Sequence, residues 1–170
     1  MRALRRGASA LLATTWLAGG CALAPTQPPK PAMHIRDVAH DGDETRRASQ
    51  QLVLEGLRAD SAHEPERARS LYQRALQVDS GNPYAYLALA RQSAEEDEPE
   101  LVLQYVDRAE DLLSTEADSS PGAEVHLEGL RGLALAQTGE TLQGHELLER
   151  AALSAPDVWG DGRLDADELR

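Results

Sequence analysis

Apolar residues recur at helical spacing over most of the chain from residue 45 onward. In the first such stretch, Leu52, Gly56 and Ala59 follow one another at i, i+4 and i+7, which places them on one face of a helix. Breaks rich in proline, glycine and polar residues interrupt the pattern at 63–65, 80–83, 98–99, 114–122 and 139, and Pro156 ends it. The pattern therefore predicts six helices, arranged as three helical hairpins, between residues 45 and 156.

Small and large residues repeat in a fixed register along these predicted hairpins. The repeated positions are Ala68, Tyr72 and Ala75, then Val102, Val106 and Ala109, and then Gly144, Leu148 and Ala151 after a longer interval. The distance from the first set to the second matches a helix–turn–helix unit of about 34 residues, which resembles the tetratricopeptide repeat. The resemblance implies an all-α domain of about three such hairpins stacked in a short superhelix. Because no hairpin buries its own apolar face, three are about the minimum for stability, and a partner or a homodimer would add to it.

The first residues have the pattern of an export signal. Arg2, Arg5 and Arg6 precede an apolar run of about a dozen residues, which is too short to span a bilayer, and the run leads to Gly20-Cys21. This arrangement resembles the signal peptides of bacterial lipoproteins, with residues 1–20 removed. The resemblance implies that Cys21, the only cysteine, receives a diacylglyceryl thioether and is then N-acylated. The residues leave open an ordinary secretory signal with an incidental cysteine, or a twin-arginine signal.

Residues 21–44 are predicted to form a linker behind this anchor. Four prolines between positions 25 and 31 exclude a helix there and favour an extended, disordered stalk. Ala22 follows the cysteine in place of aspartate, which in the lipoprotein resemblance implies the periplasmic face of the outer membrane. The stalk also holds the potential metal ligands His34, Asp37, His40, Asp41 and Asp43, and a solvated linker is the alternative for these.

The composition narrows the range of functions. The 170 residues include 29 acidic and 17 basic ones, for a net charge of −12, and no phenylalanine. This balance argues against nucleic acid, whose phosphates need clustered lysine and arginine. The chain has no nucleophile elbow, no HExxH motif and no phosphate-binding loop, so we expect no enzyme.

The first helix of each hairpin is expected to supply a groove for a partner. In tetratricopeptide arrays these helices line a concave face, and the resemblance places on it Gln50, Val53, Leu57, Tyr84, Leu87, Arg91, His126, Gly129 and Leu133. Such a surface suits a peptide segment or helix of an envelope protein, and the acidic chain favours a basic partner. The predicted function is a periplasmic adaptor or assembly factor, with a periplasmic small-ligand binder as a weaker alternative.

The acidic C-terminal residues 157–170 resemble an EF-hand calcium loop. Asp157, Asp161, Asp165 and Glu168 occupy ligand positions, and Gly162 occupies the turn position. Trp159 at the third position, Pro156 before the loop and the short stretch after it all weaken the match. The predicted alternatives are a calcium module, with affinity no better than roughly 10⁻⁴ M, and a turn in which Trp159 docks on the last hairpin while the acids stay solvated or cap a short helix. Apart from weakly bound Ca²⁺, no cofactor is expected.

Overall fold

The structure is a computed structural model that describes residues 32–115 and 122–170. These parts of the chain are helical and contain no strand, which confirms the predicted all-α class. Three hairpins follow one another: α2 (Glu44–Ser61) with α3 (Pro65–Val78), α4 (Pro83–Glu95) with α5 (Pro99–Thr115), and α6 (Ala123–Thr138) with α7 (Thr141–Ser154). Three short helices of a single turn accompany them: α1 (Ile35–Val38), α8 (Pro156–Trp159) and α9 (Ala166–Leu169). None of the helices in these described ranges is long and apolar enough to cross a membrane.

The helix boundaries follow from local sequence signals. Asp43 is the N-cap residue of α2, and its carboxylate accepts a hydrogen bond from the Arg46 N–H at 2.8 Å. Proline occupies the first position of α3, α4 and α5, where its missing N–H would have had no helical partner. Gly139 ends α6 in the left-handed conformation, with φ of 100°. The predicted breaks therefore lie at the junctions between the observed helices, except that α5 continues through Ser114 and Thr115.

The packing inside each hairpin explains the repeated register. Tyr72 is fully buried against Gly56, where a Cβ atom would clash with the ring. In the third hairpin Gly132 and Gly144 allow the backbones of α6 and α7 to touch, since a Cβ on Gly132 would lie 2.9 Å from the Gly144 carbonyl oxygen. The equivalent positions of the second hairpin, Val102 and Val106, are also buried. Small residues thus bring paired helices together, and larger ones fill the space beside them.

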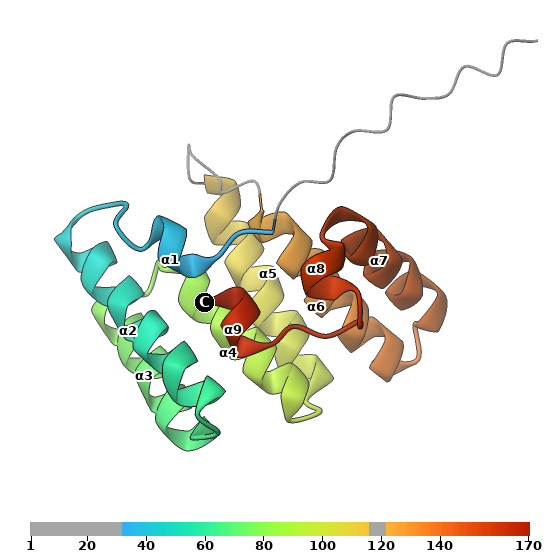
Figure 1. Cartoon of the computed structure of the whole chain (residues 1–170), viewed down its shortest axis with the longest axis horizontal. Coiled ribbons are helices and arrows are strands. Elements are labelled where there is room, and N and C mark those ends of the chain that lie inside the picture. Colours follow the sequence, from blue (N-terminus) through green and yellow to red (C-terminus); the bar gives the residue numbers. More distant parts are fainter. Residues whose placement is uncertain (1–31, 116–121) are drawn as a thin grey trace, which may run out of the picture.

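The hairpins stack so that their first helices adjoin. Helix α2 contacts α4, and α4 contacts α6, while α3 and α5 each pack against the first helix of the next hairpin. We call the surface formed by α2, α4 and α6 the inner face. Figure 1 shows the short helices α1 and α9 lying over α2 and α4, with α8 beside α6 and α7. The inner face is therefore covered by segments from both ends of the described chain.

The first of these segments shortens the predicted linker. Residues 33–39, the N-terminal segment, pack onto the domain through the buried side chains of Met33, Ile35 and Ala39. The Arg36 N–H also donates a hydrogen bond to the Arg170 carbonyl at 2.9 Å. The predicted linker up to residue 44 is therefore wrong from residue 33 onward. The apolar side chains that follow the last proline are buried against the helical domain. Cys21 and the signal sequence lie outside the described residues.

Candidate functional site on the inner face

The C-terminal residues cross the whole inner face. Residues 155–170, the C-terminal strap, begin beside α7, continue through α8 and a glycine-containing loop, and end with α9 against α2 and α4. Trp159, Leu164 and Leu169 point into the protein and are buried. The strap therefore connects the third hairpin back to the first (Figure 1).

Trp159 holds the strap at a notch in α6. Its indole is fully buried over Gly129, where a Cβ atom would clash with the ring. The Trp159 Nε1–H donates to His126 Nδ1 at 3.4 Å, and His126 Nε2 lies 2.8 Å from the Met33 carbonyl oxygen. Because Nδ1 accepts a hydrogen bond, Nε2 carries the proton and donates to Met33. The neutral His126 imidazole thus joins the N-terminal segment to the strap.

His126 makes the stability of this arrangement depend on pH. Burial lowers the pKa of His126 to about 4; the hydrogen bond to Met33 opposes this effect, and the neighbouring His34 adds to it. The unfolded chain takes up this proton near pH 6.5, so the unfolding free energy should fall as the pH drops from about 6.5 to about 4, by roughly 3 kcal/mol from this group. Urea unfolding at several pH values between 7.5 and 4.5 measures how steeply the unfolding free energy changes with pH. The His126→Asn variant should show a shallower pH dependence than the wild type. An equal pH dependence in both proteins would contradict the assignment of this effect to His126.

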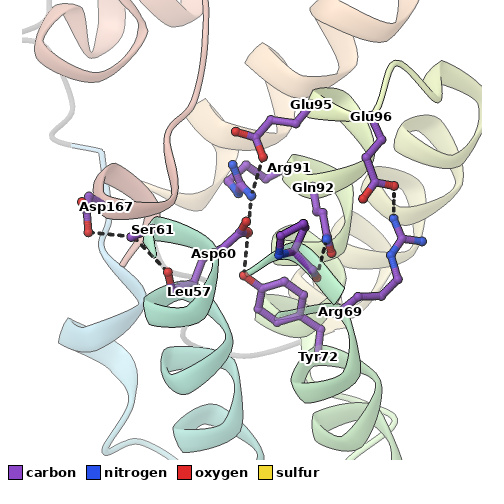
Figure 2. A network of polar contacts seen from close by, with 11 residues as sticks. Leu57, Asp60, Ser61, Arg69, Tyr72, Arg91, Gln92, Glu95, Glu96 and Asp167 are labelled. Atoms are coloured by element: carbon purple, nitrogen blue, oxygen red, sulfur yellow. Dashed lines mark hydrogen bonds and ion pairs between the residues drawn. The ribbon is translucent and has the colours of Figure 1, made fainter. Parts of the chain in front are cut away.

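A network of buried polar side chains, centred on Asp60, joins the first two hairpins. Asp60 of α2 accepts hydrogen bonds from the Tyr72 hydroxyl at 3.0 Å and from Arg91 of α4, and Arg91 also pairs with Glu95 at 3.1 Å (Figure 2). Burial, followed by the negative charge of Asp60, raises the pKa of the Tyr72 hydroxyl, so it stays protonated. Burial alone would lower the pKa of Arg91, but Asp60 and Glu95 raise it overall. Ser61, next to Asp60, binds the strap residue Asp167 at 2.9 Å.

A cleft opens between α4, α6 and the strap. Its volume is about 460 Å³, a size typical of ligand sites. Its apolar lining comes from Ala94, Leu130, Leu133 and Leu164, and its polar lining from Arg91, Glu95, Asp97, Gln137, Asp161, Gly162, Arg163 and Asp165. Arg91 is 1% exposed, and its Nε atom has no hydrogen-bond partner in the described part of the chain.

The predicted partner-binding residues do lie on the inner face, but most of them are covered. Gln50, Val53, Leu57, Tyr84, Leu87, Arg91, His126 and Gly129 are buried, while Leu133 is half-buried. The expectation of an open groove is therefore corrected: the N-terminal segment and the strap occupy it. Of the predicted residues, Arg91 and Leu133 line the cleft.

Other cleft residues were not predicted as partner contacts. Asp97 follows α4 and Gln137 lies in the last turn of α6, and their side chains bond at 2.7 Å. The strap residues Arg163 and Leu164 follow the docked Trp159 in the chain and also line the cleft. The sequence feature that could have indicated this packing is the spacing of Trp159, Leu164 and Leu169 among acidic residues.

The four predicted calcium ligands have separate roles here. Asp157 is exposed on α8, and the Asp161 carboxylate accepts from the Arg163 N–H at 3.0 Å. Asp165 and Glu168 form the capping box of α9, in which Glu168 accepts from the Asp165 N–H at 2.7 Å. Residues 32–115 and 122–170 contain no cluster of three or more side chains suited to a metal, the stalk histidines and aspartates included. The structure thus shows the docked tryptophan and capped helical turn, and calcium binding stays a prediction from the sequence.

Comparison with known proteins gives no relative to guide the interpretation. No family model, curated protein or solved structure matches the chain.

Proposed function

We propose that the chain is a lipid-anchored periplasmic adaptor that binds a segment of an envelope protein and performs no catalysis. The cleft beside the strap carries this proposal. It combines an apolar wall with charged and amide groups at its edge, a lining suited to a peptide segment. The tetratricopeptide-like register, with each hairpin buried against the next, supports the same class of function.

The proposed anchor would hold this cleft close to a membrane. The chain between Cys21 and Ala32 is short, so even fully extended it reaches at most about 40 Å. The N-terminal segment then continues directly onto the inner face, where its Met33 carbonyl meets His126. A lipid on Cys21 would therefore restrict both the distance and the orientation of the domain.

Photo-crosslinking in intact cells tests the adaptor. A photoreactive residue at Gln137, on the exposed edge of the cleft, should form an adduct with an envelope protein. The same residue at Gln77, exposed on α3, is the matched control and should form none. Cys21→Ser should release the chain from the membrane fraction and reduce the adduct. Absence of an adduct at Gln137, or equal yields at both positions, would contradict binding at the cleft.

A further inference from the structure

We propose that the cleft recognises a lysine or arginine side chain of a peptide segment. This inference rests on the proposed adaptor function and names the chemistry of its partner. Two properties of the lining carry it: the charge and the apolar wall.

The charge of the lining favours a cation. Arg91 contributes no excess positive charge, because its guanidinium already faces Asp60 and Glu95. The other acidic residues of the lining are Asp97, Asp161 and Asp165. The lining has one further basic residue, Arg163, which is exposed and forms no ion pair in the described ranges. Gln137 and the Arg163 N–H, which bind Asp97 and Asp161, are neutral donors and leave those charges uncompensated. A cationic group is therefore attracted to the cleft and an anionic one repelled.

The apolar wall distinguishes a basic side chain from a small cation. Leu130, Leu133 and Leu164 line the cleft beside the acidic groups. Lysine and arginine carry three or four methylene groups below their charge, and such stems pack along apolar surface while the charge reaches a polar edge. A bare metal ion would make no use of this wall. The combination of leucines and carboxylates fits the two parts of one side chain.

Three blocked tripeptides test the proposal on the full chain in detergent micelles. Acetyl-Ala-Lys-Ala-amide is the probe, and the peptides with norleucine or glutamate at the centre are its neutral and acidic counterparts. Titrations are followed by NMR through the leucine methyl groups. The lysine peptide should shift Leu130, Leu133 and Leu164, and it should bind roughly tenfold more tightly than the norleucine peptide. The glutamate peptide should give no shift.

Two charge-removing substitutions locate the cation. Asp97 has a positive φ of 61°, which asparagine tolerates, and Asp161 accepts a backbone hydrogen bond that asparagine can also accept. Asp97→Asn with Asp161→Asn should weaken the lysine peptide about tenfold and leave the norleucine peptide unchanged. The matched control removes two exposed acids elsewhere, Glu66→Gln with Asp111→Asn, and should leave both affinities unchanged. Arg163→Ala should strengthen lysine binding, since Arg163 competes for the same acids.

The outcomes separate this inference from the adaptor function. Equal binding of the lysine and norleucine peptides would overturn charge recognition while still placing a peptide in the cleft. Shifts confined to leucines outside the cleft, or no shift with the peptide in large excess, would overturn the inference altogether. The crosslink from Gln137 in cells is independent of these titrations, so an adduct there would support the adaptor even if every tripeptide failed.

Discussion

Replacing Trp159 by alanine should lower the unfolding free energy by about 3–5 kcal/mol, the usual cost of removing a large buried aromatic side chain. The indole is fully buried over the Gly129 notch and donates to His126, so its loss leaves a cavity and removes the main attachment of the strap to α6. The melting temperature should fall by on the order of 10 °C. Urea and thermal unfolding followed by circular dichroism measure both quantities.

The Trp159→Phe variant is the control for this experiment. Phenylalanine fills much of the same notch but cannot donate to His126, so its cost should be well below that of alanine. Val158→Ala removes a half-buried neighbour in the same short helix, and its cost should be only about 1 kcal/mol, as for other small losses of packing. An alanine variant at 159 that melts at the same temperature as the wild type would contradict the docking of the strap.

Replacing Asp60 by alanine should destabilise the chain by a similar amount, about 3–5 kcal/mol. The change leaves the Arg91 guanidinium buried with only the more exposed Glu95 beside it, and it removes the acceptor of the Tyr72 hydroxyl. Equilibrium urea unfolding at pH 7 measures the loss.

A double variant distinguishes a buried charge from lost packing. Asp60→Leu with Arg91→Leu removes both charges and should be clearly more stable than Asp60→Ala, because no uncompensated charge stays buried. The surface pair of Glu128 and Arg150, 3.4 Å apart, supplies the comparison. There, Glu128→Ala should cost no more than about 1 kcal/mol. A double variant no more stable than the single one would show that packing, and not the charge pair, sets the cost.

The hairpins could be predicted from the sequence because each depends on local patterns. Spacing of apolar residues, the proline at the start of α4 and the glycine after α6 are all visible within short windows. Tyr72 and Val106, which occupy the same position in the repeated register, are both buried. These are contacts within a helix or between adjacent helices, and their periodicity is strong.

The covering of the inner face could not be predicted in the same way. The strap contains two single-turn helices and several acidic residues, and no helical periodicity marks it as part of the core. Its attachment depends on the contact between Trp159 and Gly129, which are separated in the sequence by the whole of α7. Ile35 follows a proline-rich run that predicts a linker, yet it is fully buried. Asp60 looks like a surface acid until Arg91 is brought to it by the stacking of α2 and α4. Each case depends on tertiary contacts that no local pattern encodes.

The candidate site was accessible to sequence reasoning only in part. The expected face included Arg91 and Leu133, but the cleft also needs Asp97 from a turn and Arg163 from the strap. Because these residues come from separate segments, their proximity follows from the fold alone.

The strap also changes how this array can unfold and how it can evolve. An open array of repeats frays from its two ends, since each unit touches only its neighbours. Here the last helix, α9, contacts the first hairpin, and the carbonyl of Arg170 binds the N-terminal segment at Arg36. The strap and the N-terminal segment therefore connect the first hairpin to the third, and the three hairpins are expected to unfold in a single concerted step. Inserting a hairpin between α7 and the strap would therefore be expected to separate Trp159 from Gly129 and break this closure.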